Sequence, residues 1–373
     1  MIKVLHINCN YTGNHVHRTM IQHLNNNEDI CSNVFVPVYS EKSDLKQTNN
    51  VVVKKCFKRI DRFVFYYKSK KIRKAVENAY QIKDFDIFHA YTLYTDGNVA
   101  YKLNKKYNIP YVVAVRNTDV NTFFKYRFYL RRRGIKILQN ASAVFFLSKA
   151  YKDETFNKYI PQKYKDDINK KTYIIPNGID DLWFLNNNIE KNKIDKNLIK
   201  IVYSGRIDKN KNIETTQKAL EILRNKGINY KFSVVGPIDN KKIYNRIIKN
   251  KNTIYFPKMD IKELINLYKK NDIFIMPSKK ETFGIVYAEA ISQGLPVIYT
   301  KGQGFDYQFK EGVVGFHVDY NNPNEITKKI KEIIEKYNEI SNNCLINCKE
   351  FKWDKICNKY IELYKTITKD RGI

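Results

Sequence analysis

Two basic side chains frame a turn in the second half of the chain. Gly205-Arg206 ends a predicted strand, and Lys211 stands just before a predicted helix. A glycine permits a tight turn, and the N–H groups at a helix N-terminus attract anions. The segment therefore predicts a cradle for a diphosphate, although it lacks the pattern of a P-loop. A basic turn without such a role, in a basic protein, is the alternative that these residues leave open.

Two carboxylates flank a second glycine-containing loop. Glu281 follows a predicted strand, Thr282–Gly284 form the loop, and Glu289 lies inside the next predicted helix. An ionised carboxylate accepts hydrogen bonds from two hydroxyl groups, which suits a ribose or a hexose. The free N–H groups of the helix N-terminus offer a second site for an anion. Acidic pairs at this spacing are common on helices, so the pair alone is weak evidence for a sugar site. The neighbouring segments Pro277-Ser278 and Gly294-Leu295-Pro296-Val297 strengthen that interpretation.

Short β-rich runs alternate with helical patterns along the chain, which predicts a doubly wound α/β protein. A polar, Asn-rich segment at 185–197 is typical of a linker. We therefore expect an N-terminal domain at 1–184, a C-terminal domain at 185–352, and a final amphipathic helix at 353–373. Ligands of open α/β sheets bind at the carboxyl ends of the strands, so a cleft between the two domains is the expected site. The predicted strands are 3–7, 33–37, 86–89, 111–115, 143–147 and 172–175 in the first half, and 199–203, 231–235, 254–256, 273–276 and 297–299 in the second.

These motifs, in this order, resemble family 4 of the retaining, nucleotide-sugar-dependent glycosyltransferases, which have the GT-B fold. Asp86-Ile87-Phe88-His89 resembles a strand end of that family, and Pro176-Asn177-Gly178-Ile179-Asp180 resembles its interdomain turn. Trp353 and the helix after it resemble the segment that crosses back onto the first domain. The resemblance covers the whole chain. It implies two Rossmann-like domains that face each other across a cleft, the first for the acceptor and the second for the donor.

The resemblance also implies roles for single residues. Arg206 and Lys211 would bind the donor diphosphate and offset the charge of the leaving group, an effect that can be worth several kcal/mol. Glu281 would accept hydrogen bonds from the donor sugar, and Glu289 from the ribose. Met259 falls where the family lines the nucleobase pocket. The other donor-binding residues implied are Gly13, Gly205, Thr282, Phe283, Gly284, Ile285 and Val286.

The first domain departs from the family's pattern. The family often has paired glycines after the first strand, where this chain has Gly13 alone, and a His after the fourth strand, where this chain has Arg116. We expect Arg116, Asn117, Asp119 and Tyr91 to bind the acceptor. Asp119 would orient the acceptor hydroxyl, or would only cap a helix that begins near Val120. The expected catalytic residues are Arg206, Lys211, Glu281 and Asp119.

Positive charge dominates the composition. Lys and Arg number 67 and Asp and Glu 38, a net charge of +29, which points to a polyanionic partner or to composition alone. Between Lys54 and Lys74, ten cations are interleaved with Phe, Tyr and Ile, and a second cluster spans 125–133. We expect the first segment to lie on an anionic membrane surface, with Phe57, Phe63, Phe65 and Tyr66 adding apolar contacts. A solvated basic face is the alternative.

No metal and no other cofactor is expected. The six cysteines form no Cys-x2-Cys pair, and the histidines do not cluster at ligand spacing. Asp84-Phe85-Asp86 has the Asp-x-Asp form that holds a divalent cation in glycosyltransferases of the GT-A fold. It precedes a strand without any accompanying GT-A pattern, so a metal role is not expected there.

The function expected is metal-independent transfer of a hexose or N-acetylhexosamine, with retention, from a nucleoside diphosphate sugar, UDP ahead of GDP. The acceptor would be a hydroxyl of a glycan or of a lipid-linked oligosaccharide, in the assembly of bacterial capsule, lipopolysaccharide or another glycoconjugate. Another GT-B enzyme, such as a UDP-sugar 2-epimerase, and a non-enzymatic nucleic-acid-binding protein are the alternatives. The sequence shows no nucleic-acid recognition module, and carboxylates would repel a polyanion, so no nucleic-acid partner is expected. Without a signal peptide or an apolar run of the ~18–20 residues that span a bilayer, a cytoplasmic protein at the inner face of the plasma membrane is expected.

Overall fold

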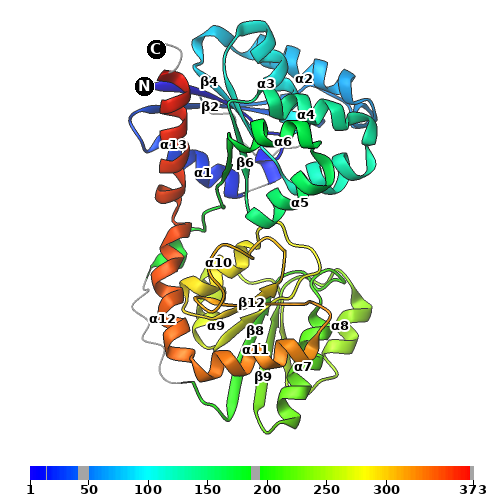
Figure 1. Cartoon of the computed structure of the whole chain (residues 1–373), viewed down its shortest axis with the longest axis vertical. Coiled ribbons are helices and arrows are strands. Elements are labelled where there is room, and N and C mark those ends of the chain that lie inside the picture. Colours follow the sequence, from blue (N-terminus) through cyan, green and yellow to red (C-terminus); the bar gives the residue numbers. More distant parts are fainter. Residues whose placement is uncertain (14, 41–49, 186–193, 370–373) are drawn as a thin grey trace. The chain divides into compact units, whose positions relative to one another are not determined.

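A computed structural model describes residues 1–13, 15–40, 50–185 and 194–369. Its contacts divide the chain into two units (Figure 1). Unit 1 comprises Met1–Leu147, Lys152–Pro176 and Trp353–Ile373, and unit 2 comprises Ser148–Tyr151 and Asn177–Lys352. Most of the linker predicted at 185–197 lies outside the described residues.

The main segment of unit 2 begins at Asn177, whereas the predicted domain boundary lies between residues 184 and 185. Two contacts within unit 2 explain the difference. The N–H of Ile179 donates to the carbonyl of Phe351, and the buried Trp183 ring lies 5.4 Å from that of Tyr268. These contacts attach the segment after Pro176 to the second core.

Unit 1 is built on a seven-stranded, wholly parallel sheet in the order β3-β2-β1-β4-β5-β6-β7. Its central strands are buried on both faces, as parallel strands with crossover helices must be. The strands are β1 (Ile2–Ile7), β2 (Ile30–Val38), β3 (Val51–Lys55), β4 (Ile87–Ala90), β5 (Tyr111–Ala114), β6 (Ala143–Phe146) and β7 (Thr172–Ile174).

Helices cover both faces of this sheet (Figure 1). α1 (His15–Asn25) packs against α13 (Trp353–Lys369), and α13 adds Trp353, Ile356 and Tyr360 to a core shared with the sheet. The C-terminal helix thus belongs to the unit of the N-terminal strands. α2 and α3 pack together over the other face, as do α3 and α4. The remaining helix bounds are α2 (Phe65–Ala79), α3 (Thr95–Tyr107), α4 (Arg131–Asn140), α5 (Lys149–Tyr159) and α6 (Gln162–Asn169).

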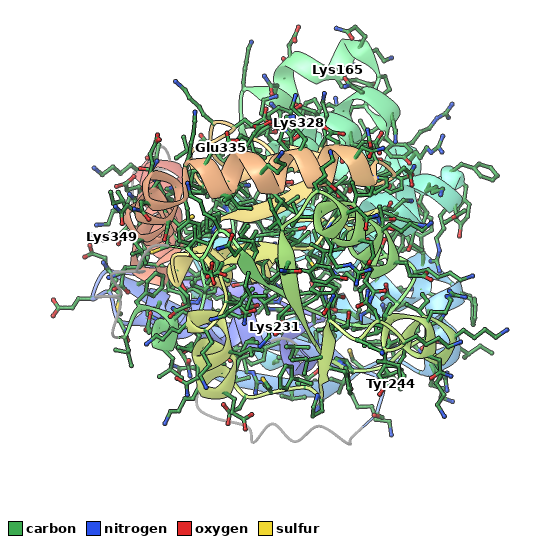
Figure 2. All side chains as sticks on the ribbon, turned by 90° about the horizontal axis from the view of Figure 1, so that it is seen from below. Lys165, Lys231, Tyr244, Lys328, Glu335 and Lys349 are labelled. Atoms are coloured by element: carbon green, nitrogen blue, oxygen red, sulfur yellow. The ribbon has the colours of Figure 1, made fainter. Side chains whose placement is uncertain are left out.

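Unit 2 has a six-stranded parallel sheet in the order β10-β9-β8-β11-β12-β13. On one face of the sheet, α7 packs against α8 and α11. The buried side of α11 includes Ile326 and Ile330, and its charged Lys328 and Glu335 are exposed on the outer side (Figure 2). The strands are β8 (Leu198–Ser204), β9 (Asn229–Val235), β10 (Thr253–Phe256), β11 (Ile273–Ile275), β12 (Val297–Thr300) and β13 (Gly315–Val318). The helices are α7 (Ile213–Asn225), α8 (Lys241–Ile247), α9 (Ile261–Lys269), α10 (Ile285–Ser292), α11 (Pro323–Glu335) and α12 (Tyr337–Asn347).

Candidate functional site

The strand order of unit 2 reverses between β8 and β11, which are neighbours in the sheet but not in the chain. The loops after such strands diverge to opposite faces, and the space between them is where open α/β sheets bind ligands. The loop after β8 carries Arg206 and Lys211, and the loop after β11 carries Glu281. The residues predicted to hold the diphosphate and the sugar therefore lie at one switch point.

Lys211 and Glu281 form an ion pair across this point. Nζ of Lys211 lies 2.6 Å from Oε2 of Glu281, and their side chains are only 15% and 17% exposed. This contact was not predicted, because the two residues are far apart in the chain. A lysine ammonium carries three donors, so Lys211 keeps hydrogen-bonding capacity for a phosphate oxygen while it contacts Glu281.

Arg206 is the more exposed cation of the site. Its guanidinium lies 3.3 Å from Asp239 and 3.6 Å from Asp208, and its side chain is 61% exposed. Such surface pairs contribute little free energy, so the guanidinium can exchange them for an anionic ligand. The backbone of Arg206 is fixed, since its carbonyl accepts a 2.6 Å hydrogen bond from the buried hydroxyl of Tyr203.

The loop after β11 is held in place by the loop after β12. The N–H of Glu281 donates to the side-chain oxygen of Gln303, and the N–H of Gly304 donates to the carbonyl of Glu281. The two backbones run so close that a Cβ atom on Gly304 would lie 2.2 Å from the carbonyl carbon of Thr282. Only glycine fits at Gly304, so its role is to let the loops touch.

The start of α10 presents free backbone donors. Gly284 has a φ of +77° and sits at the N-cap, where a Cβ atom would strike the ring of Tyr287. Among the described residues, nothing accepts a hydrogen bond from the N–H groups of Gly284, Ile285 or Val286. A helix N-terminus with free N–H groups attracts negative charge. Phe283 contributes only backbone here, because its ring is buried beside Phe351.

Glu289 lies one turn further along α10 and is half-buried. No described residue donates a hydrogen bond to its carboxylate. Burial, and then the negative charge of Asp180, raise its pKa to about 7. An unpartnered carboxylate in such surroundings is suited to accept hydrogen bonds from hydroxyl groups of a ligand.

Three further side chains of this site were not anticipated. Asn210 donates to the carbonyl of Lys280 and accepts its N–H, and Asn212 donates to the carbonyls of Pro277 and Tyr320. They join the loops after β8, β11 and β13, and Gln303 joins the loop after β12. An asparagine at positive φ, as Asn212 is at +59°, is typical of such a position. Of the other predicted residues, Gly205 and the half-buried Met259 follow β8 and β10.

In unit 1, Asp119 is a structural anchor. Its buried carboxylate accepts hydrogen bonds from the N–H groups of Leu93, Tyr94 and Arg116, at 2.9–3.1 Å. Burial nevertheless raises its pKa to about 6, against the effect of these donors. These hydrogen bonds give Asp119 a role in fixing the loops after β4 and β5, and its expected role at an acceptor hydroxyl stays a prediction.

The prediction that Tyr91 binds the acceptor is wrong. The side chain is fully buried and its hydroxyl pairs with Nδ1 of His6, so it belongs to the core. Arg116 is half-buried and donates to the carbonyl of Tyr91 at 3.4 Å, and burial lowers its pKa. Asn117 and Gly13 are exposed, and a Cβ atom on Gly13 would meet nothing within 4 Å.

In the stretch from Lys54 to Lys74, four aromatic residues were expected to contact a membrane, but only two of them, Phe63 and Tyr66, are exposed. Phe57 and Phe65 are each 7% exposed and pack in unit 1, whereas Phe63 is 78% exposed. The second cluster lies alongside, since the guanidinium of Arg133 stands 5.3 Å from the ring centre of Tyr66. We call the exposed apolar and aromatic residues of both clusters the basic–aromatic face; they are Ile60, Phe63, Val64, Tyr66, Tyr67, Tyr126, Phe128 and Tyr129.

Within the described residues, no group of three or more His, Cys, Asp or Glu side chains is arranged to hold a metal ion. In the Asp-x-Asp segment, Asp86 accepts a 2.8 Å hydrogen bond from the N–H of Lys3. None of the described helices has the length and apolar content needed to cross a bilayer.

Two family models match consecutive parts of the chain. Residues 27–181 match "Glycosyltransferase Family 4", and residues 186–350 match "Glycosyl transferases group 1". Together they account for most of the sequence. The chain belongs to the family 4 glycosyltransferases.

Three curated proteins are similar in sequence to this family 4 glycosyltransferase. An uncharacterized glycosyltransferase of Methanocaldococcus jannaschii is 24% identical over 331 residues, 86% of this chain and 85% of that protein. A 41.2 kDa protein in the cps region of Klebsiella pneumoniae is 27% identical over 178 residues, which span 47% of this chain and 49% of that protein. The capsular polysaccharide biosynthesis glycosyltransferase CapM of Staphylococcus aureus is 27% identical over 158 residues, 39% of this chain and 41% of that protein.

Solved structures place the family 4 glycosyltransferase in the GT-B fold. The lipopolysaccharide outer core galactosyltransferase WaaB matches with a TM-score of 0.77 at 14% identity, over 98% of this chain and 99% of that one. The Anabaena protein Alr3699/HepE, solved in complex with UDP, matches with a TM-score of 0.72 at 17% identity, over 98% of this chain and all of that one. Two parallel-sheet, Rossmann-like domains are what the GT-B fold requires, and both are present here.

Proposed function

We propose that the chain transfers a hexose or N-acetylhexosamine from a nucleoside diphosphate sugar to a hydroxyl group of a glycan or lipid-linked acceptor. The observation that carries the proposal is the Lys211–Glu281 pair at the switch point of unit 2, beside the free N–H groups of α10 and the unpartnered Glu289. These groups offer cations for a diphosphate and carboxylates for sugar hydroxyls. Their combination at one sheet edge matches the two halves of such a donor.

In the proposed reaction, the bond between the anomeric carbon and the diphosphate breaks, the acceptor oxygen forms the new bond to that carbon, and its proton passes to an oxygen of the departing diphosphate. Lys211 and Arg206 would offset the negative charge that develops on the departing diphosphate. Glu281 would hold the donor sugar and Glu289 the ribose. We propose that these two cations make transfer independent of a divalent metal and that the anomeric configuration is retained.

Similar proteins support UDP as the nucleotide and surface polysaccharide as the setting. Structures of the Anabaena neighbour contain UDP, UDP with glucose, and UDP-glucose. One relative takes part in capsular polysaccharide biosynthesis, and one structural neighbour is a lipopolysaccharide galactosyltransferase. We therefore propose UDP ahead of GDP, and a surface glycan as the product.

We further propose that unit 1 docks on an anionic bilayer through the basic–aromatic face. Ten cations and one acid lie between Lys54 and Lys74, and Phe63 and Phe128 are 78% and 71% exposed. Exposed aromatic groups among cations are typical of a surface that lies in the headgroup region. The enzyme would then work at the cytoplasmic leaflet, where a lipid-linked acceptor is within reach.

Thermal unfolding of the full chain with UDP, GDP or a short oligonucleotide tests the proposed function. A nucleoside diphosphate at 100 times its Kd adds about 2.7 kcal/mol of stability. We expect a rise in Tm with UDP, a smaller one with GDP, and none with the oligonucleotide. Stabilisation by the oligonucleotide alone would contradict the assignment.

A further inference from the structure

A cavity of about 470 Å³ lies in unit 1 at the carboxyl ends of its central strands. It borders the switch point of that sheet, where β1 and β4 are neighbours. Cys9 and Asn10 follow β1, Thr92 follows β4, and Thr118 follows β5. Open α/β sheets bind ligands at such points, so this cavity lies where a ligand of unit 1 is expected.

Three cations line this cavity, and each lies over an aromatic ring that also lines it. The guanidinium of Arg62 is 4.4 Å from the ring centre of Tyr39, and that of Arg127 is 4.8 Å from Phe123. Nζ of Lys68 is 4.7 Å from the ring centre of Phe57. Among the described residues, none of the three cations forms an ion pair with a carboxylate. In the same segment, Lys71 does pair with Asp61, at 2.8 Å.

Two acids face this region: Asp119 lines the cavity and Asp96 lies next to it, and the carboxylates of both already accept hydrogen bonds. Asp119 accepts three backbone N–H groups, as described above. Asp96 is fully buried and accepts hydrogen bonds from the N–H of Cys9 and the hydroxyl of Thr92. Burial raises the pKa of Asp96 to about 7. Its charge acts on Lys68 in the direction that raises the pKa of that ammonium group. The cavity therefore presents an excess of positive charge to a ligand.

Hydroxyl groups complete the lining. Thr12, Thr95, Thr118 and Thr122 border the cavity, and their hydroxyls have no partner among the described residues. Thr95 also opens α3, whose N-terminus favours negative charge. Cations, hydroxyl donors and a helix N-terminus together suit a phosphoryl group, which carries three acceptor oxygens and more than one negative charge.

We propose that this cavity binds a phosphate group carried by the acceptor, with the sugar or polyol part of the acceptor against the aromatic wall of Tyr39, Phe57 and Phe123. The inference rests on the proposed function, which assigns the donor diphosphate to unit 2 and leaves unit 1 for the acceptor. A single carboxylate would need one arginine, whereas three unpaired cations match a doubly charged group. The phosphate belongs either to a free sugar phosphate or to a lipid-linked head group.

Calorimetric titration of the full chain with glucose 6-phosphate, farnesyl phosphate, glucose and glucuronate tests this proposal. Arg62→Gln and Lys68→Gln remove one cavity cation each, and Lys105→Gln removes an exposed charge of α3 that does not line the cavity. UDP is titrated in parallel, and its affinity shows that each variant is folded. Failure of UDP to bind the wild type counts against the proposed function alone.

We expect one of the two phosphates to bind, and each cavity variant to weaken that binding about tenfold, which corresponds to about 1.4 kcal/mol. Lys105→Gln should leave it unchanged, and all three variants should keep the UDP affinity. Tighter binding of glucose 6-phosphate identifies a free sugar phosphate, and tighter binding of farnesyl phosphate a lipid-linked one. The proposal is overturned if glucose or glucuronate binds as well as the phosphates, if neither cavity variant matters, or if Lys68→Gln weakens UDP equally.

Discussion

Lys211 and Glu281 show how two residues with separate expected roles act as one unit. Their 2.6 Å contact holds the ammonium at the edge of the sheet before any ligand arrives. A prearranged cation costs no reorganisation at the moment when charge develops on a leaving group. In the proposed function, Glu281 would therefore both orient Lys211 and accept hydrogen bonds from the donor sugar.

Lys211→Ala should lower the rate of sugar transfer roughly 100-fold, the scale expected when one charge-stabilising donor is lost. Lys209→Ala removes an exposed charge from the same loop and is the matched control. Steady-state rates with a competent donor, together with thermal unfolding of each variant, provide the measurement. Equal rates for Lys211→Ala and Lys209→Ala would refute the role of Lys211.

Donor affinity should depend on the ionisation of Glu289. With a pKa raised to about 7, its carboxyl group is largely protonated at pH 6 and largely ionised at pH 8. Because protonation turns one carboxylate oxygen from an acceptor into a donor, UDP should bind about tenfold tighter at pH 8 than at pH 6. The phosphate of UDP also titrates near pH 6, so Glu289→Gln is needed as the reference. The same pH dependence in wild type and Glu289→Gln would remove Glu289 from the ribose site.

At the residue scale, the residues predicted in unit 2 lie together, whereas those predicted in unit 1 do not form one site. Lys211, Glu281 and the loop to Val286 lie together because the motifs that carry them follow strands that meet at one switch point. The prediction for Tyr91 was wrong because the sequence does not show which way the ring of a tyrosine at a strand end points. Here the ring points into the core. The cations of the unit 1 cavity come from separate elements, so no single motif could reveal them.

At the scale of elements, the predicted strands of both sheets are confirmed, and two further strands, β3 and β13, were not predicted. β3 (Val51–Lys55) runs into the basic stretch, and its lysines obscured the strand pattern. α2 was missed for the same reason, although Phe65, Ile72 and Val76 give it a buried face. β13 begins at Gly315 and contains His317, so its apolar run is interrupted and does not stand out.

The contact between the loops after β11 and β12 should be sensitive to a single methyl group. Gly304→Ala would force its Cβ into the backbone of Thr282 and Phe283, which we expect to cost about 3 kcal/mol and to weaken UDP binding. Gly302→Ala has open space at its Cβ and is strained only by a φ of +70°, so it should cost about 1 kcal/mol. Urea unfolding of both variants measures the difference. Equal losses of stability would show that the loops do not need this close approach.

At the scale of the whole molecule, the charge of +29 is spread widely. Lys231, Lys328 and Lys349 all lie on the outer surface of unit 2 (Figure 2). Net charge therefore does not by itself locate a partner. What distinguishes unit 1 is that its cations surround exposed aromatic rings, a combination that solvation alone does not require.

Vesicle co-sedimentation tests the basic–aromatic face. Binding should require anionic lipid and should weaken as salt shortens the screening length, since each cation contributes about 1 kcal/mol near such a surface. Replacing Lys54, Lys55, Lys70, Lys71 and Lys74 by Gln should abolish it, and Phe63→Ser with Phe128→Ser should weaken it. Replacing Lys231, Lys328 and Lys349 by Gln is the control on unit 2. Equal binding to neutral and anionic vesicles, or none at low salt, would leave the face as a solvated surface.

The central claim is that unit 2 activates a nucleoside diphosphate sugar. Its most direct test is release of nucleoside diphosphate from a panel of UDP- and GDP-sugars, with EDTA present, by the wild type and by Lys211→Ala. We predict release from at least one UDP-sugar, undiminished by EDTA and lost in Lys211→Ala. Release from no sugar of the panel, or release that EDTA stops and Mn²⁺ restores, would contradict the account.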